Sequence, residues 1–126
     1  MEEKQYRELQ METLEEMLIY LEKLIPATES IIIELRDQRK TDTDEFFTAI
    51  INGINWTIEV LNRTMDIMNE DEAVIEKDNI NDAIFKLGLA IREHNNINIA
   101  DVLEVNIVPF LSIIRSRASV ITNKIS

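Results

Sequence analysis

Cysteine is absent from this chain of 126 residues, and glycine and proline occur only twice each. Without cysteine the chain forms neither disulfides nor thiolate metal sites, which is compatible with a reducing cytoplasm. An all-β protein of this length would need many more turn residues. The scarcity of glycine and proline therefore favours long helices joined by few loops.

Histidine is equally scarce, since His94 is the only one. One histidine is too few for a typical zinc site, for the paired Glu-x-x-His motifs of a di-iron bundle and for a catalytic triad. We expect His94 to end a helix, where the helix dipole favours it, and the acidic run Glu70–Glu72 to form a solvated loop. The sequence therefore predicts no catalytic residue, no metal site and no cofactor, and the chain is not expected to be an enzyme.

The composition is otherwise that of one globular domain: 45% of the residues are hydrophobic and 29% are charged, with a formal net charge of −11. Such a negative surface repels phosphate backbones and anionic lipid, so we expect no nucleic acid and no membrane as partner. A basic partner or plain solubility fits the charge better. No signal peptide and no apolar run of membrane-spanning length is evident, so we expect a single cytoplasmic domain over residues 1–126.

In the first half of the chain, apolar residues recur at alternating spacings of four and three, the pattern of helices that pack along a bundle seam. One helix is predicted over about residues 12–39, and residues 1–11 either extend it or fray from it. Its seam consists of Leu14, Leu18, Leu21, Ile25, Thr28, Ile32 and Leu35. A second helix is predicted over about residues 43–69. Its seam consists of Phe47, Ile51, Ile54, Ile58, Leu61, Met65 and Met68.

The start of the second helix and the course of the first depend on single residues. Thr41 with Asp44, or Asp42 with Glu45, has the spacing for reciprocal capping of the second helix. Pro26 interrupts the first pattern, but the apolar phase continues across it. We therefore predict one bent helix, with a break at Pro26 as the alternative.

Two further helices are predicted over about residues 79–95 and 98–122. Asp78 or Asn79 is expected to cap the third, and Asn98 with Asp101 to open the fourth, in which Pro109 predicts a second kink. The apolar side of the fourth helix consists of Ile99, Val102, Leu103, Ile107, Phe110, Leu111, Ile113, Ile114, Ala118 and Ile121. Short linkers make neighbouring helices antiparallel. The predicted fold is an all-α, single-domain, antiparallel up-down four-helix bundle with proline kinks in the first and last helices.

Several apolar residues lie off these seams and form the candidate partner surface, because clustered exposed hydrophobes often mark a contact. They are Trp56, Phe85, Leu89, Val105 and Val108. The alternative is that these flanks pack on neighbouring helices, or that an N-terminal segment with Tyr6 and Leu9 covers part of them. Two arginines, at 115 and 117, are expected to complement the dipole of the last helix near its C-terminus.

Two stretches carry a resemblance: Gly53-Ile54-Asn55-Trp56-Thr57-Ile58-Glu59 and the run Ala100–Leu111, which reads ADVLEVNIVPFL. They resemble a family of small helical proteins from Gram-positive bacteria, in which a Gly-x-x-Trp helix precedes one of the form Ala-Asp-x-Leu-Glu-x-x-x-x-Pro-x-Leu. The resemblance covers most of residues 14–115. It implies a bundle and a bacterial origin, and it supplies no catalytic residue because that family has no assigned activity.

These observations favour a non-enzymatic protein–protein interaction module that binds another protein or a second copy of itself. Its size, acidity and helix content are also similar to those of export or flagellar-type chaperones for helical partners. The remaining alternatives are a structural homo-oligomer, such as a homodimer, and a small-ligand carrier that uses a pocket left by the proline kinks.

Overall fold

The computed structural model describes residues 2–37 and 40–123, with side chains from residue 4 onward. Its elements in chain order are α1 (Glu2–Arg36), α2 (Thr43–Met68), α3 (Lys77–Arg92), α4 (Asn96–Val102), the π-helical turn η1 (Leu103–Ile107) and α5 (Val108–Asn123). Because α4, η1 and α5 follow one another without a gap, they form one long helix. The fold is therefore an all-α four-helix bundle, with no strand among the described residues.

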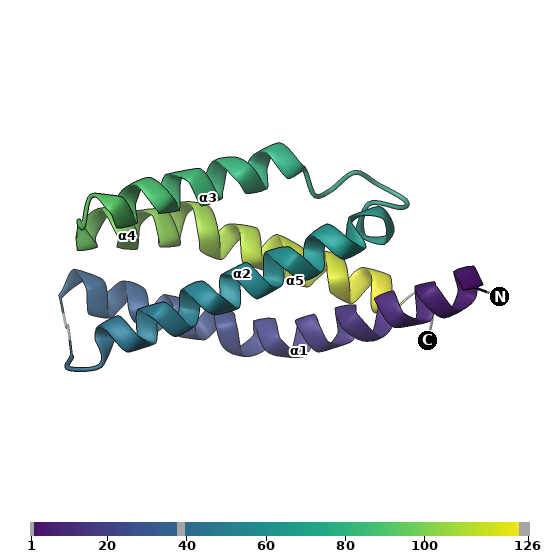
Figure 1. Ribbon diagram of the computed structural model, residues 1–126, viewed down its shortest axis with the longest axis horizontal. Helices are drawn as coiled ribbons and strands as arrows, with labels where there is room; N and C mark the ends of the chain where they lie inside the picture. The colour runs from purple at the N-terminus through teal and green to yellow at the C-terminus, as the bar shows by residue number, and fades with distance from the viewer. Residues whose placement is uncertain (1, 38–39, 124–126) are drawn as a thin grey trace.

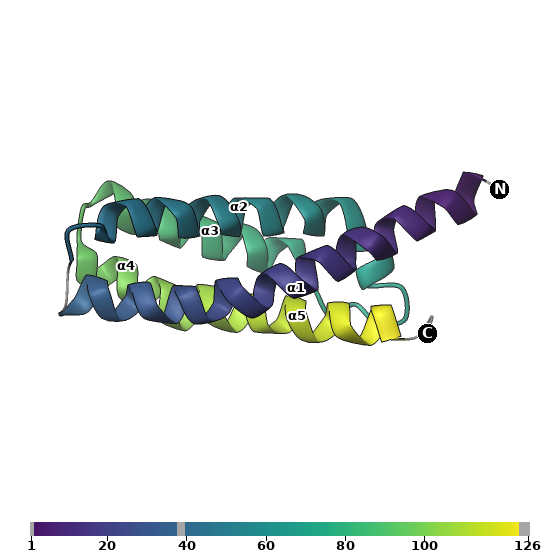
Figure 2. The same ribbon diagram turned by 90° about the horizontal axis from the view of Figure 1, so that it is seen from below.

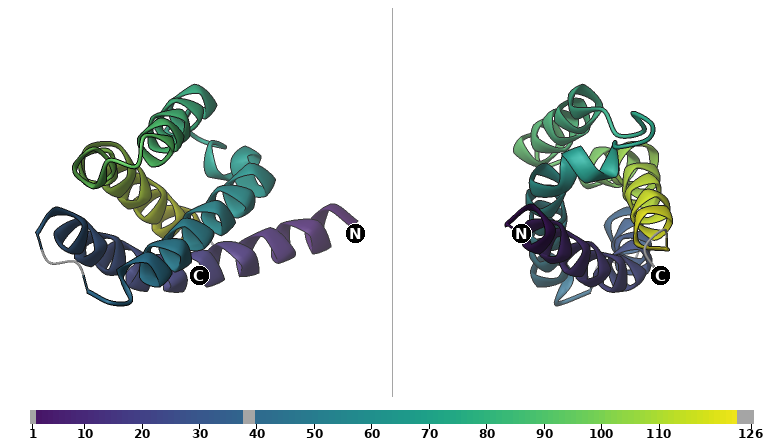
Figure 3. Two further views of the ribbon diagram at one scale, coloured as in Figure 1. Left: turned by 60° about the vertical axis from the view of Figure 1, so that its left-hand side comes forward. Right: turned by 90° about the vertical axis from the view of Figure 1, so that its right-hand side faces the viewer.

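The four rods run in alternating directions along the long axis of the molecule (Figure 1). The backbone of helix α1 comes close to those of α2, α4 and α5, whereas the backbone of α3 comes close to those of α4 and η1. Figure 3 shows the rods around a common centre. Most of the close approaches thus join α1 to α2 and to the long helix.

Helix α1 begins at Glu2, so residues 2–11 extend the helix rather than fray from it. The extension is fixed to α2 by Gln10, a buried side chain whose Nε2 donates to the carbonyl of Arg63 at 3.3 Å and to Asp66 Oδ1 at 3.0 Å. Pro26 lies inside α1 without breaking it, and α1 bends along its length in Figure 2. The helix ends at Arg36, and the expected end at Arg39 lies outside the described residues.

The core follows the predicted seams of α1 and of the long helix. The members of the α1 seam are buried, apart from Leu18, which is half-buried against the core. Of the ten residues predicted for the apolar side of the long helix, seven are buried in the core: Ile99, Leu103, Ile107, Leu111, Ile114, Ala118 and Ile121. Val102 and Phe110 are only half-buried, and the prediction is wrong for Ile113, which is exposed. Burying each aliphatic side chain contributes about 1.5–3 kcal/mol relative to leaving it in water.

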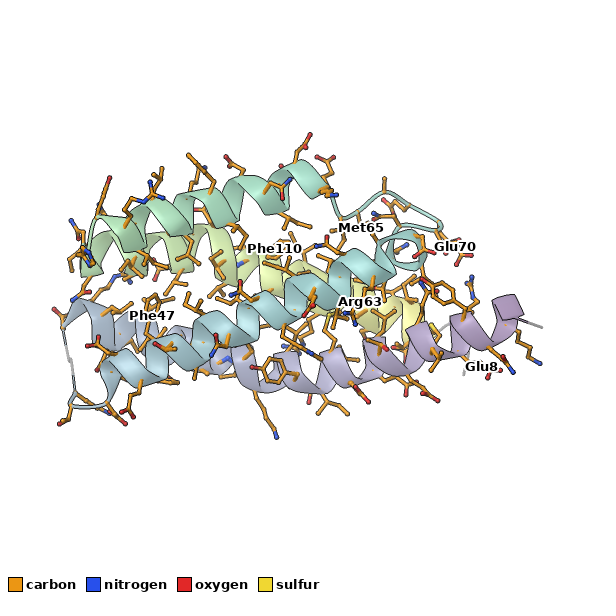
Figure 4. The ribbon with its side chains drawn as sticks, viewed as in Figure 1. Glu8, Phe47, Arg63, Met65, Glu70 and Phe110 are labelled. Carbon is orange, nitrogen blue, oxygen red and sulfur yellow. The ribbon has the colours of Figure 1, made fainter. Side chains whose placement is uncertain are left out.

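Helix α2 is rotated relative to its predicted seam. Phe47 and Met65, both labelled on α2 in Figure 4, are only half-buried, whereas Thr57 and Thr64 from the adjoining strip are fully buried. The two threonine hydroxyls donate to carbonyls one turn earlier in the same helix, at 2.9 Å and 2.8 Å. A threonine whose hydroxyl is satisfied within its own helix is compatible with a dry interface. The predicted seam of α2 follows aliphatic and aromatic side chains alone, and so it misses this strip.

The long helix accommodates Pro109 by changing locally from α-helical to π-helical geometry just before the proline. Proline has no N–H, so the carbonyl of Val105 cannot receive the usual bond from position 109. Residues Leu103–Ile107 form a π-helical turn, and the Val108 N–H donates to the Leu103 carbonyl five residues earlier. Where the sequence predicts a kink, the structure therefore widens the helix by one residue just before the proline.

The predicted capping pairs of α2 are wrong. Asp42 is the N-cap residue, but its side chain makes no capping hydrogen bond. The hydroxyl of buried Thr43 instead accepts the Lys40 N–H at 2.7 Å and donates to Glu34 Oε1 at 2.9 Å. The start of α2 is thus fixed by α1, through a carboxylate nine residues earlier in the chain.

The other two predicted caps are also displaced. Helix α3 begins at Lys77 after the N-cap residue Glu76, not after Asp78 or Asn79. At the start of α4, Asn95 is the N-cap residue, and its side chain accepts the Asn98 N–H at 3.1 Å. Each observed cap therefore precedes the predicted one by two or three residues.

Candidate functional site

The five residues of the candidate partner surface differ in exposure. Trp56 is half-buried and packs edge-on against Tyr20 of α1, with ring centroids 5.1 Å apart at 74°. Val108 is half-buried against the core. Each of these two side chains therefore packs against a neighbour within the bundle, and neither is fully available to a partner.

The other three members are exposed. Phe85 is 65% exposed, and Leu89 lies one turn later on α3, opposite the buried side of that helix. Val105 is exposed on η1. The alternative that an N-terminal segment covers Phe85 and Leu89 is wrong, because both residues are exposed, as are Tyr6 and Leu9 on α1.

His94 follows the C-terminal end of α3 and has a left-handed backbone conformation. It follows the C-cap residue Glu93, has a φ of 55° and donates its N–H to the Ile91 carbonyl at 3.0 Å. It thus occupies the left-handed position that commonly closes a helix. Among the residues that the structure describes, no three histidine, aspartate or glutamate side chains gather where they could hold a metal ion.

A different set of exposed side chains does converge, on the outer side of α5. Ile113 is 49% exposed, Val120 is 46% exposed, and Val74 from the α2–α3 loop is 38% exposed. Together with Ser112, Ser116 and Arg117, these three line a hollow of about 410 Å³. We call this the apolar hollow.

The loop that brings Val74 to α5 is held by one amide side chain. Asn69, directly after α2, donates its Nδ2–H to the Ile75 carbonyl and accepts the Ile75 N–H at its Oδ1, both at 2.9 Å. Ile75 is buried in the core. With Ile75 fixed inward, the preceding Val74 faces out, at the rim of the apolar hollow.

Arg117 is the charged group of this hollow and is only 8% exposed. Its Nε donates to the carbonyl of Met68, the last residue of α2, at 2.5 Å. A cation at the C-terminal end of a helix is stabilised by the free carbonyls there. Arg117 thus complements the dipole of α2, whereas the sequence predicted that it would complement its own helix.

A second hollow, of about 520 Å³, adjoins the first across a ridge of small side chains. Ser112 and Ser116 line both hollows, and Ser119 lines the second. The other lining residues of the second hollow are Leu18, Glu22 and Arg115. The outer side of α5 thus presents a serine ridge with an apolar depression on one side and a polar one on the other.

The apolar hollow offers a ligand apolar contacts and a few polar groups. Its lining consists of three aliphatic side chains, two serine hydroxyls and one guanidinium, without a carboxylate or an imidazole that could act as a general base. The sequence held a signal for it: positions 113, 116, 117 and 120 follow the i, i+3, i+4, i+7 spacing of one helical face. The apolar spacing instead places Ile113 among the core residues, so the sequence does not single out this face.

The long helix also passes a test for membrane spans. Within the described residues, Asn96–Asn123 is the one helix long and apolar enough to cross a membrane, judged by length and composition alone. A core helix of a bundle meets the same criterion, and this helix packs its buried side on α1. About a third of its apolar window is buried inside the bundle (33%).

Comparison with protein families gave one result. A family model described as "Domain of unknown function (DUF8042)" matches residues 12–117. Comparison with curated proteins gave no match, and comparison with solved structures gave none either.

Proposed function

We propose a function for this chain from its own surface, because it belongs to a family, the domain of unknown function DUF8042, whose description assigns none. The chain is a non-enzymatic protein–protein interaction module. It binds a helix of another protein along the outer side of α5. We further propose that it is a bacterial, cytoplasmic protein that acts without cofactor, nucleic acid or membrane.

The observation that supports this proposal is the convergence of Val74, Ile113 and Val120 on one hollow. Single exposed hydrophobes are common on soluble proteins, but a cluster that lines a depression is typical of a contact surface. Apolar side chains of a partner would fill the hollow and serve as its anchors.

The shape of the surface favours a helix as the partner element. Ser112, Ser116 and Ser119 lie one turn or slightly less apart, and their short side chains let a second helix approach closely. An apolar stripe on that helix would then meet the apolar hollow, as in other helix-in-groove contacts.

The charge favours a different protein over a second copy. Each chain has a formal net charge of −11, so a dimer would double a charge that already repels itself. Helix α5 is the exception in this acidic chain, because it has no acidic residue and two arginines.

The test uses paired substitutions that add no charge. We expect Ile113→Gln with Val120→Gln to abolish capture of a partner that the wild-type chain captures from extracts of its source cell. The control is Ile33→Gln, which changes an exposed isoleucine on α1 outside both hollows and should retain that partner. Circular dichroism should be unchanged in both variants.

Three results would overturn the proposal. They are capture of no protein by the wild-type chain, retention of the partner by the double variant, and a wild-type dimer in light scattering that the double variant alone dissociates. The last result would assign the α5 surface to contact between copies.

A second candidate function, a structural homo-oligomer, is favoured by Phe85 and Leu89 alone. These two exposed side chains lie one turn apart on α3, away from the apolar hollow. They would form a small contact between copies of the chain, separate from the α5 surface.

A further inference from the structure

Arg117 has an unmet requirement for hydrogen-bond acceptors. A guanidinium has five N–H donors and is permanently charged, and here it is more than nine-tenths buried. Its Nε is satisfied by the Met68 carbonyl, but its Nη2 is buried without any hydrogen-bond partner. Leaving a charged donor buried and unpaired is unfavourable, so the fold keeps this group against a free-energy penalty.

The acceptor is not supplied from within the hollow. Its lining has no carboxylate, and α5 has no acidic residue along its whole length. Arg117 forms no ion pair with any residue that the structure describes. The guanidinium thus lies beside aliphatic walls with no anion opposite it.

We propose that the apolar hollow takes a carboxylate flanked by aliphatic groups: the partner helix presents an aspartate or glutamate to Arg117, next to apolar side chains that contact Ile113 and Val120. This inference rests on the proposed function and specifies its partner. Arginine and carboxylate form the charge-assisted hydrogen bonds that Nη2 lacks. The aliphatic walls strengthen that pairing by excluding water.

The walls also argue against a more highly charged anion. A phosphate group has up to two charges and a large hydration shell, which three aliphatic side chains would remove without compensation. A single carboxylate at the end of an aliphatic chain matches both halves of the lining, the guanidinium and the hydrocarbon.

Three small probes with the same six-carbon chain test the head group directly on the wild-type protein. They are hexanoate, hexanol and hexylammonium. The readout is the change in NMR chemical shift of the Arg117 Nε–H and of the methyl groups of Val74, Ile113 and Val120. We expect hexanoate to bind about tenfold more tightly than hexanol, the effect of one charged hydrogen bond, and hexylammonium to cause no shift.

Two variants locate the effect. Arg117→Lys keeps the charge but loses the planar fork, so hexanoate binding should fall to about that of hexanol. Arg115→Met removes the neighbouring arginine, which lines the other hollow, and should leave hexanoate binding unchanged. Should Arg117→Lys fail to fold because the bond to Met68 is lost, the head-group comparison on the wild-type chain still decides.

Different results would overturn the carboxylate inference and the proposed function. Equal binding of hexanoate and hexanol, or shifts that are equally large for hexylammonium, would overturn the carboxylate inference and leave the α5 surface standing. Hexanoate shifts that are confined to residues outside the apolar hollow would also overturn it. Partner capture that survives Ile113→Gln with Val120→Gln would instead overturn the proposed function, whatever hexanoate does.

Discussion

Gly53 of α2 lies directly beneath the side chain of Tyr20 of α1. A Cβ at position 53 would overlap the Tyr20 hydroxyl oxygen and come within 2.9 Å of Leu24 Cδ1. Leu24 is buried, and the Tyr20 ring is held in place by the edge of Trp56. The packing of α1 on α2 at this point therefore depends on the absence of a side chain at position 53.

We expect Gly53→Ala to destabilise the fold by on the order of 1–2 kcal/mol, because overpacking outweighs the gain in helix propensity. Gly88→Ala is the matched control: Gly88 also lies inside a helix, but nothing is within 4 Å of the added Cβ. It should stabilise the protein by up to about 1 kcal/mol. Urea unfolding measures both. The fluorescence of Trp56, the only tryptophan, should change in the first variant alone.

A gain in stability from Gly53→Ala would contradict this account, because it would show that Tyr20 moves aside at no cost. An unchanged Trp56 spectrum in a destabilised Gly53→Ala variant would place the strain elsewhere than at the aromatic pair.

Thr43 and Thr57 are both fully buried, but their hydroxyls have different roles. Thr43 joins the start of α2 to Glu34, whereas Thr57 bonds only to a carbonyl of its own helix, that of Gly53. Thr43→Val should cost about 1–3 kcal/mol, because it leaves the Glu34 carboxylate and the Lys40 N–H without their partner. Thr57→Val should change stability by less than about 1 kcal/mol.

Urea unfolding of the two valine variants under identical conditions decides between these roles. Equal losses would mean that the contact of Thr43 with Glu34 contributes no more than a local hydroxyl bond.

The sequence predicted the packing of α1 well, because its seam is almost entirely aliphatic and one register buries all of it except Leu18, which is half-buried. In α2 the same spacing was misleading. Phe47 and Met65 belong to the predicted seam, yet they are half-buried because α3 does not pack closely on α2. Periodicity gives the direction of an apolar stripe, but it does not identify the neighbouring helix.

The candidate site could not be predicted from the sequence, for a related reason. The apolar hollow joins Val74, in a loop, to Ile113 and Arg117 in the last helix, and the bond from Arg117 to Met68 spans 49 residues. Local patterns do not report such pairs. In the sequence, only the spacing of Ile113, Arg117 and Val120 indicates this surface. Because the helix is so apolar, its pattern does not distinguish a second contact side from the side that faces the core.

Phe85 and Leu89 are predicted to tolerate charge. Because both are exposed on α3, Phe85→Glu with Leu89→Glu should leave the helical circular dichroism unchanged and alter stability by less than about 1 kcal/mol. Light scattering of the same samples tests the homo-oligomer: a mass below that of the wild-type chain would assign this pair to a contact between copies. Unfolding of the double variant would place the two residues in the core and contradict their observed exposure.

Arg36 joins the end of α1 to the long helix, since its guanidinium donates to Asp101 and Glu104, both at 2.9 Å. The hydrogen bond from Arg36, reinforced by its charge, holds the pKa of Glu104 below its ordinary value of 4.5. A lowered carboxyl pKa stabilises the folded state above that value, and the contribution is lost as the pH falls through the folded-state pKa. Below about pH 5, thermal stability of Glu104→Gln should therefore fall less steeply than that of the wild-type chain. Identical slopes for Glu104→Gln and the wild-type chain would show that the Arg36 pair contributes nothing to the pH dependence.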